Sequence, residues 1–379
     1  MKAWTPTHPV WMELDLEALE ANYHEIRRRI GRDVKLVASI KADGYGHGAV
    51  EVARRLTRLG VYALATGSFA DAVAIRQAGI DARILMFGGC TPEGVRELQR
   101  HSLIPTVHTM ELARAASASG VAPAPVYIKV DCGLGRLGVP LALAEDFAKE
   151  VAALPNIVLE GLYTHLPFSD ASGRDWARQR LAAFHELVAT LAASGLEIPV
   201  TQALSSAGII AGLKNHCSAV CPGHLLYGIS PVLPDIADAA PFRPVLRSIK
   251  AQLIHVGHHA GQWTAGVGGY YPLESGSTIG VVPLGLNDGY RNPAKGRTAA
   301  VLLRGRRVPV IGVSLEHTTI DLSAIEHPAV GEEVSVLGGA GTEAIGLPEM
   351  AEAQGVRPID VLMAFSRRLP RSYHPPPLE

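Results

Sequence analysis

Short apolar runs alternate with longer amphipathic stretches from Asp15 to about Tyr227. The apolar runs are LVASI (36–40), VYALAT (61–66), RILMF (83–87), IPTV (104–107), VYIKV (126–130), VLEGLYT (158–164), TQAL (201–204) and LLYGI (225–229). Stretches with helical character, such as 48–59, 71–78 and 174–193, lie between them. Strand–helix alternation of this kind is typical of a parallel sheet, and eight units close a barrel. An open doubly wound sheet is the alternative, but no GxGxxG follows the first run, so a dinucleotide-binding fold has no support.

The pattern changes near Pro231. The segment PVLPDIADAAPFRP (231–244) is rich in proline and small residues, as linkers are. Strand-like runs separated by turn signals follow it, which favours a mostly β domain. We therefore predict an α/β chain with an N-terminal (β/α)8 TIM barrel over 12–235. Residues 240–379, together with residues 1–11, are predicted to form a C-terminal mostly-β domain. The strand candidate Trp11 to Leu14 is expected to join the second domain, because the barrel count is already full.

The composition is that of an ordinary globular enzyme. A chain of 379 residues suggests two domains, and a net charge of −1 gives no general attraction to nucleic acid or to a membrane surface. The N-terminus lacks the apolar stretch of a signal peptide, and four cysteines are too few for a disulfide framework. Cys217 and Cys221 have CxxxC spacing, but no second pair completes a metal site. We expect a cytoplasmic protein with reduced thiols and no metal.

The segment VASIKADGYGH (37–47) places a lysine where an apolar run ends. Burying the amine of Lys41 is costly unless it is deprotonated, paired or covalently consumed. Aldehyde chemistry consumes it, and pyridoxal phosphate (PLP) is the commonest protein-bound aldehyde that forms a Schiff base with lysine. The glycines around Tyr45 let the backbone approach a ligand closely. The structural alternative is a surface lysine that precedes a turn.

Polar side chains follow several of the predicted strands. In parallel barrels the chemistry lies at the carboxyl ends of the strands, so such residues are expected to meet at one mouth. They are Lys41 after the first run, Lys129, Asp131 and Arg136 at the fifth, Tyr163 and His165 at the sixth, Ser205 and Ser206 after the seventh, and Cys221, Pro222 and Gly223 just before the eighth.

Together these motifs resemble the alanine racemase family of fold-type III PLP enzymes over essentially the whole chain. The matching segments are 39–48, 129–138, 163–165, 205–206, 221–223, 283–290 and 368–371. The resemblance implies a PLP cofactor on Lys41, held further by Tyr45, His165, Ser205, Ser206, Cys221, Gly223, His224 and Arg367. It implies catalytic roles for Lys41, Arg136, His165, Tyr270 and Tyr271, and substrate contacts from Arg136, Leu315 and Glu316. It also implies a homodimer in which 265–271 and 312–318 face Lys41 of the partner subunit.

The sequence departs from the family pattern around the substrate. Cys221 stands where the family usually has an arginine that contacts the pyridine nitrogen, and a cysteine lacks that permanent charge. Val267 stands where racemases of the family have the tyrosine that serves the second face of the substrate, so Tyr270, Tyr271, Glu316, His317 or a cysteine must replace it. A Met-Asp pair of the family appears as Leu315-Glu316, and Arg367 stands near the place of a phosphate-binding tyrosine.

These departures leave three hypotheses. The first is a PLP-dependent amino-acid racemase that acts on an amino acid other than alanine, or in addition to it. The second is a one-faced reaction on the same fold, such as decarboxylation, elimination, retro-aldol cleavage or transamination. The third is a PLP-binding protein without turnover. We favour the first, with an amino acid as the small-molecule substrate and a second copy of the chain as the expected partner.

Overall fold

The computed structural model describes residues 9–265, 271–340, 342–365 and 368–376. The chain divides into two compact units, one of Glu17–Pro244 and one that combines the residues up to Leu16 with Val245–Glu379. Tyr270, Val267 and Arg367 lie outside the described residues.

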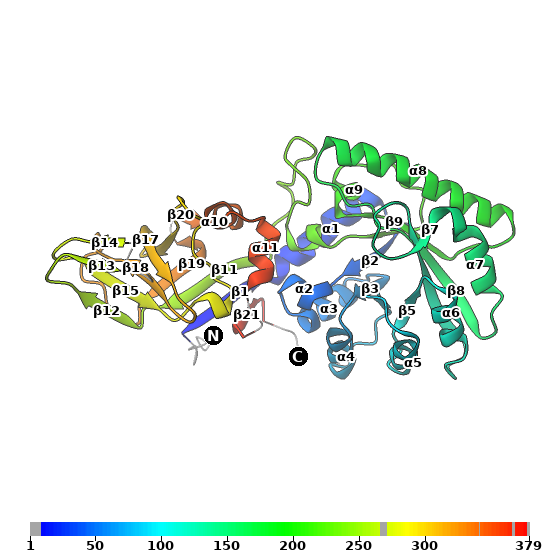
Figure 1. Cartoon of the computed structure of the whole chain (residues 1–379), viewed down its shortest axis with the longest axis horizontal. Helices are drawn as coiled ribbons and strands as arrows, with labels where there is room; N and C mark the ends of the chain where they lie inside the picture. The colour runs from blue at the N-terminus through cyan, green and yellow to red at the C-terminus, as the bar shows by residue number, and fades with distance from the viewer. Residues whose placement is uncertain (1–8, 266–270, 341, 366–367, 377–379) are drawn as a thin grey trace. The chain divides into compact units, whose positions relative to one another are not determined.

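The first unit is a closed barrel of eight parallel strands (Figure 1). Its strands, in their order around the barrel, are β2 (Lys35–Ser39), β3 (Ala63–Thr66), β4 (Ile84–Met86), β5 (Ile104–Val107), β6 (Ala124–Asp131), β8 (Ile157–Tyr163), β9 (Val200–Ser205) and β10 (Ala219–Cys221). Pairing of β10 with β2 closes the ring, and the short β7 (Val139–Pro140) pairs beside β6. The predicted TIM barrel is confirmed.

Helices follow the strands and lie outside the barrel (Figure 1). They are α1 (Leu16–Ile30), α2 (Lys41–Tyr45), α3 (Ala49–Arg58), α4 (Phe69–Gln77), α5 (Pro92–Arg100), α6 (Met110–Ser117), α7 (Ala144–Ala152), α8 (Ala171–Ala193) and α9 (Ser206–Ile210), with 3-10 turns η1 (Leu141–Leu143) and η2 (His224–Tyr227). Side chains of Ser68, Thr91, Thr109 and Asp170 cap α4, α5, α6 and α8 by accepting a backbone amide of the first turn. Such caps satisfy amides that a helix leaves without partners.

The eighth strand differs from the prediction. The run LLYGI was taken as this strand, but its first part forms η2, and the strand is the preceding β10. A short buried apolar run does not distinguish a strand from a helical turn. Here Gly228 ends the turn with φ of 73°, a value that glycine adopts without strain. Gly223 and His224 therefore follow the eighth strand instead of preceding it, which places them with the other strand ends.

Buried side chains of the barrel strands pack together as a core cluster. Tyr127, Tyr163 and Cys221 are buried there beside small residues such as Ala63 and Ala219. Tyr163 shares a hydrogen bond with Thr106 at 3.1 Å between the hydroxyl oxygens. Close packing of this kind gives the strand ends a rigid support, because buried side chains cannot shift without creating a cavity.

The second unit is built on a ten-stranded sheet and confirms the predicted mostly-β domain. Its strands are β1 (Val10–Asp15), β11 (Leu246–Gln252), β12 (His255–His258), β15 (Thr278–Val282), β16 (Ala300–Leu303), β17 (Arg306–Val313), β18 (Thr318–Asp321), β19 (Glu333–Ala340), β20 (Glu343–Ile345) and β21 (Arg371–His374). A separate hairpin pairs β13 (Trp263–Ala265) with β14 (Tyr271–Leu273). The 3-10 turn η3 (Leu286–Asp288) and helices α10 (Leu347–Gln354) and α11 (Pro358–Ala364) complete it.

Strand β1 belongs to this second sheet. It pairs antiparallel with β11 and parallel with β21, so the first and last described strands of the chain are neighbours. Elsewhere in the sheet, the predicted turn at 304–306 joins β16 to β17 with positive φ at Arg304 and Gly305, as a two-residue hairpin turn requires.

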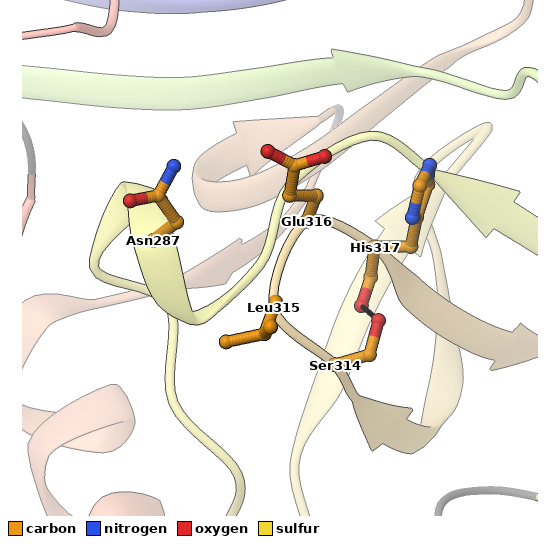
Figure 2. Close-up of a pocket in the computed structure, with 5 residues that line it drawn as sticks. All are labelled: Asn287, Ser314, Leu315, Glu316 and His317. Atoms are coloured by element: carbon orange, nitrogen blue, oxygen red, sulfur yellow. Dashed lines mark hydrogen bonds between the residues drawn. The ribbon is translucent and has the colours of Figure 1, made fainter.

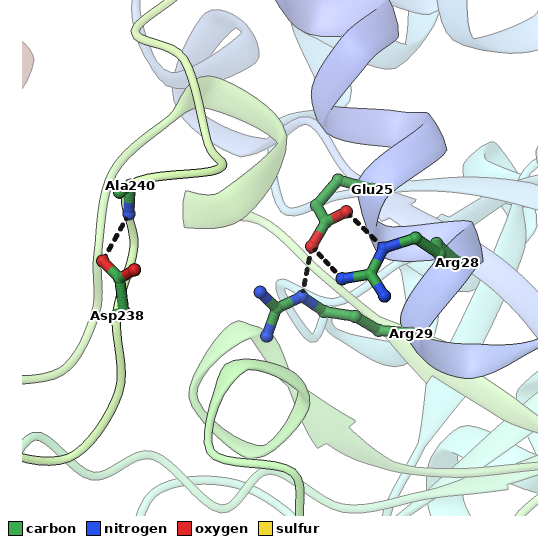
Figure 3. Close-up of polar contacts among 5 residues, drawn as sticks. All are labelled: Glu25, Arg28, Arg29, Asp238 and Ala240. Atoms are coloured by element: carbon green, nitrogen blue, oxygen red, sulfur yellow. Dashed lines mark hydrogen bonds and ion pairs between the residues drawn. The ribbon is translucent and has the colours of Figure 1, made fainter.

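Polar contacts also order the outer surface of the barrel unit. In Figure 3, the carboxylate of Glu25 on α1 accepts hydrogen bonds from Arg28 at 2.8 Å and Arg29 at 2.7 Å. In the connecting segment, the carboxylate of Asp238 accepts the amide of Ala240 at 2.8 Å. Among the described residues, no helix is long and apolar enough to cross a membrane.

Candidate active site

Lys41 begins a turn of left-handed backbone at the carboxyl end of β2. Ala42, Asp43, Gly44 and Tyr45 have φ values of 54°, 58°, 62° and 54°. Three of these residues carry a Cβ atom, and left-handed backbone costs such a residue about 1–2 kcal/mol. The sequence interpretation placed the Tyr45 hydroxyl at ordinary helical reach from Lys41. The observed turn has the opposite hand, and it leaves the Lys41 amine 5.6 Å from the centre of the Tyr45 ring.

Aromatic packing fixes the far end of this turn. The ring of Tyr45 packs against Tyr227 at 4.7 Å between centroids and meets His224 edge-on at 5.4 Å. Tyr227 also stacks on His47 at 4.9 Å, and its hydroxyl donates to the carbonyl of Ser39 at 3.2 Å. These contacts join the ends of β2 and β10, so the turn is packed from two sides.

The amine of Lys41 lies among the strand ends. Desolvation lowers the pKa of Lys41, the Cys221 thiol opposes that effect, and the charge of Arg136 adds to it. A lysine with a lowered pKa is more often neutral, and the neutral amine is the form that attacks an aldehyde. The environment of Lys41 therefore suits the reaction that the sequence predicts for it.

A second group of residues forms a small cradle beside Tyr45. The hydroxyl oxygen of the buried Ser206 accepts the backbone amides of Gly223 at 2.9 Å and Leu225 at 3.3 Å. A Cβ atom on Gly223 would lie 2.2 Å from the Tyr45 hydroxyl, so only glycine fits there. Hydroxyls and backbone amides that converge in this way are the donors that a phosphate group needs.

Charged groups on β6 and the following loop lie near enough to Lys41 to interact with its charge. Lys129 is buried, with 4% of its surface exposed, and desolvation together with Arg136 lowers its pKa to about 8. Burial would raise the pKa of Asp131, but amides of Gly133, Gly135 and Leu134 donate to its carboxylate and hold the pKa below its usual value. The Asp131 carboxylate thus shapes the loop that carries Arg136.

His165 and Cys221 complete the barrel side of the candidate site. Desolvation, reinforced by the charges of Lys41 and Arg136, lowers the pKa of His165 to about 3, so its ring is neutral near neutral pH. Desolvation raises the pKa of Cys221 to about 12, so the side chain is a thiol. Ser205 pairs with Cys221 between β9 and β10.

The residues present fit PLP. The absence of a Cβ atom at Gly223 lets the Tyr45 hydroxyl approach the backbone of the cradle, and Ser206 and Tyr45 supply hydroxyls for a phosphate. Lys41 supplies an amine for the aldehyde, and neutral His165 supplies a flat, uncharged surface for the ring.

The predicted substrate residues of the C-terminal domain form a cup of their own. Asn287, Ser314, Leu315, Glu316 and His317 line an open cavity of about 560 Å³. Figure 2 shows that the side chains of Asn287, from η3, and Glu316, from the segment between β17 and β18, point to the same side. The cup is rigid, because the amides of Leu286 and Asn287 each donate at 2.9 Å to carbonyls of Ser314 and Leu315. Leu315 is 71% exposed in the single chain.

Tyr271 lies apart from this cup, on β14. Its hydroxyl donates to the carboxylate of Asp321 at 3.0 Å, and desolvation together with that carboxylate raises its pKa. The structure therefore brings together Lys41 and the other barrel residues in one place, and Leu315 and Glu316 in another, while Tyr271 is paired with Asp321.

Sequence reasoning missed two residues that shape the Lys41 turn. The carboxylate of Asp71 accepts the amide of Asp43 at 3.0 Å, and the ring of Tyr227 packs against Tyr45. Ser68 and Asp71 have the spacing of a helix-capping motif, which signals the start of α4 but not a contact with another loop. Tyr227 was assigned to a strand, which hid its contacts.

Comparison with known proteins agrees with this geometry. Residues 14–231 match the N-terminal domain of alanine racemases, and residues 246–373 match the C-terminal domain. With a closed barrel that presents Lys41 beside a phosphate cradle, these matches define a PLP-dependent racemase, an isomerase. The alanine racemase of Methanococcus maripaludis is 32% identical over 374 residues, which cover 97% of this chain and 99% of that protein. The chain belongs to the alanine racemase family.

Solved structures show the same likeness. The alanine racemase from E. faecalis superposes with a TM-score of 0.88 at 28% identity, covering 97% of this chain and 98% of the other. The alanine racemase of Clostridium difficile 630 gives 0.88 at 27% identity, covering 97% and 96%.

Proposed function

We propose that this racemase acts on an amino acid other than alanine, or in addition to it. The observation that carries the proposal is the cup, where Leu315 and Glu316 replace the family's Met-Asp pair beside an open cavity. A longer carboxylate arm and a branched apolar side chain change both the reach and the shape of a substrate pocket. The cofactor side keeps most of the family motifs, with Cys221 and Arg367 as its departures, and the cup carries the changes that meet the substrate.

In the proposed chemistry, different groups transfer a proton on the two faces of the substrate Cα. Bound PLP stabilises the negative charge that develops when the Cα proton leaves. The amine of Lys41 removes or returns that proton on one face. The Arg136 guanidinium binds the substrate carboxylate or the ring oxygen, and His165 packs on the ring as a neutral imidazole. Tyr45, Ser206 and the amides near Gly223 and His224 hold the phosphate.

The second face requires another proton carrier. We propose Tyr270 or Tyr271 for this role, with Glu316 and His317 as alternatives from the cup. The bond from Tyr271 to Asp321 would have to break or reorient before its hydroxyl could serve the Cα proton. Conversion of each candidate to Phe or Gln separates them, because loss of the true carrier removes inversion while Lys41 still exchanges the proton of one enantiomer.

We also propose a homodimer in which the cup of one chain completes the barrel site of the other. The exposed Leu315 and the exposed Leu286 near it are apolar side chains of the kind that a partner covers. The cytoplasm is the proposed location, and the four free cysteines are consistent with a reducing compartment.

A screen of L- and D-amino acids in deuterated water tests the substrate proposal. NMR would follow deuterium at Cα, chiral chromatography would follow inversion, and the Lys41→Ala variant is the control. We expect inversion with Cα deuterium for at least one amino acid besides alanine. Inversion of alanine alone contradicts the proposal. Deuterium without inversion, or release of carbon dioxide, supports a one-faced reaction favoured by the Cys221 thiol, and an unchanged absorbance with every amino acid supports a non-catalytic PLP-binding protein.

A further inference from the structure

The left-handed turn after Lys41 needs a feature that holds it, because its backbone is unfavourable for three of its four residues. The contacts within the turn include the amide of Gly46, which donates to the carbonyl of Ala42 at 3.0 Å. The carboxylate of Asp43 accepts the amide of Ala49 at 2.8 Å, and its carbonyl accepts Gly48 at 2.9 Å. These contacts connect the turn to α3, but they leave the amide of Asp43 for a partner from another element.

That partner is Asp71, a residue of α4. Its carboxylate accepts the Asp43 amide at 3.0 Å, and only 4% of its surface is exposed. Its own amide donates to the capping hydroxyl of Ser68 at 3.1 Å, so the first turn of α4 fixes its place. A hydrogen bond to a buried carboxylate is stronger than one between neutral groups, because the acceptor is charged.

The bond depends on the hand of the turn. The direction of an amide N–H follows from the backbone angles, so a right-handed turn would point the Asp43 amide in a different direction. Asp71 therefore favours the left-handed form over its alternative. The turn has Lys41 at its start and Tyr45 at its end, so this contact bears on the position of both, together with the packing of Tyr45 against Tyr227.

We propose that Asp71 is a positioning residue, which acts through the left-handed turn to place the Lys41 amine and the Tyr45 hydroxyl for PLP. This inference rests on the proposed cofactor roles of Lys41 and Tyr45. Asp71 itself touches neither the cofactor nor the substrate. Its effect on the site is transmitted by the backbone of residues 42–45.

The test compares the Asp71→Ala variant with a matched control, Glu111→Ala. Glu111 is an exposed acidic residue in the first turn of α6, so its loss reproduces the change in helix-end charge without touching the turn. PLP binding to apoprotein is measured by absorbance titration, and hydrogen exchange of the peptide 40–48 is measured in apoprotein. We expect Asp71→Ala to weaken PLP binding by about tenfold or more and to speed exchange of that peptide. Glu111→Ala should match the wild type in both.

A rescue experiment separates positioning from general support of α4. Glycine adopts left-handed backbone without a steric penalty, and the Ala42 side chain has no polar group to lose. Ala42→Gly in the Asp71→Ala background should therefore recover about threefold or more of the lost PLP affinity. Affinity that does not recover, or exchange that increases equally in α4 and in 40–48, overturns the proposal. Wild-type affinity and exchange in Asp71→Ala also overturn it.

Asp71→Asn keeps the experiment decisive if Asp71→Ala does not fold. Its amide oxygen still accepts the Asp43 amide but lacks the charge, so a smaller loss of PLP affinity is expected, again recovered by Ala42→Gly. Wild-type affinity in Asp71→Asn overturns the proposal. Borohydride treatment of the wild-type holoprotein distinguishes the two levels of inference. Absence of an adduct on the Lys41 peptide overturns the proposed function, whereas an adduct with no effect of Asp71 overturns only the positioning role.

Discussion

His165 and Cys221 show how burial sets the charge of single residues in this site. Desolvation lowers the pKa of the imidazole and raises that of the thiol, so both side chains are neutral near neutral pH. A neutral imidazole can pack on an aromatic ring without losing the hydration energy of a positive charge. A neutral thiol is a weak donor, so Cys221 provides no permanent charge where the family has arginine.

The pKa of His165 makes the stability of the apoprotein depend on pH. The unfolded chain binds a proton below about 6.5, whereas the folded protein resists it down to about 3. Falling pH therefore favours the unfolded state, and from about pH 7 to about pH 5 the wild type should lose about 2 kcal/mol more unfolding free energy than His165→Gln. Denaturant unfolding of both apoproteins measures the difference. Equal losses would show that the folded imidazole titrates normally.

The pKa of Cys221 governs its chemical reactivity. At about pH 8 roughly one thiol in 10⁴ is a thiolate when the pKa is near 12, and the thiolate is the reactive form. We expect iodoacetamide to leave Cys221 unmodified in apoprotein under conditions that alkylate the partly exposed Cys90. Peptide mass spectrometry over time measures both residues in one sample. Alkylation of Cys221 at the rate of Cys90 would contradict the buried thiol.

At the scale of elements, the sequence indicated the barrel strands well but not the local backbone of the site. The run IPTV matches β5, because β-branched residues between turn signals suit a strand. The run LLYGI was wrongly predicted to be the eighth strand, because an apolar run this short has no periodicity that distinguishes a strand from a helical turn. The left-handed turn of residues 42–45 could not be predicted from its own sequence. It depends on a hydrogen bond to Asp71 on α4 and on the packing of Tyr227 against Tyr45.

The candidate site shows the same division. Lys41, His165 and Ser206 could be placed because parallel strands bring their carboxyl ends to one mouth. Leu315 and Glu316 of the cup were predicted from the family resemblance, but their backbone support from Leu286 and Asn287 follows from hydrogen bonds that no sequence pattern reveals.

The cup depends on a close backbone approach at Gly285, whose φ of −145° is ordinary extended backbone. A Cβ atom there would lie 2.6 Å from the Glu316 nitrogen and from the Leu315 carbonyl, so Gly285→Ala must displace the loop. We expect racemase activity to fall by about 10²-fold, because small misplacements of substrate contacts are costly. Steady-state kinetics measures the fall. Gly339→Ala is the control, since its nearest neighbour would lie at 3.4 Å, and an equal fall in both variants would contradict the role of the cup.

At the scale of the molecule, the proposed sharing of active sites between two chains predicts complementation between inactive chains. Lys41→Ala removes the barrel contribution, and Gly285→Ala disrupts the cup. A heterodimer of the two, purified through two different tags after co-expression, should have about half of the wild-type activity, because one of its two sites has both parts intact. Either homodimer should be nearly inactive. A heterodimer as inactive as the homodimers would place each complete site within a single chain.

The pairing of β1 with β11 and β21 also bears on how the chain is made. A ribosome releases β1 before either of its neighbours in the sheet, and the residues of the entire barrel separate it from them in the sequence. Strand β1 must therefore remain unpaired while the barrel residues emerge and fold as a domain. Synthesis that stops before residue 371 would leave that first strand without its parallel neighbour, so truncated chains should be prone to degradation and aggregation in the cell.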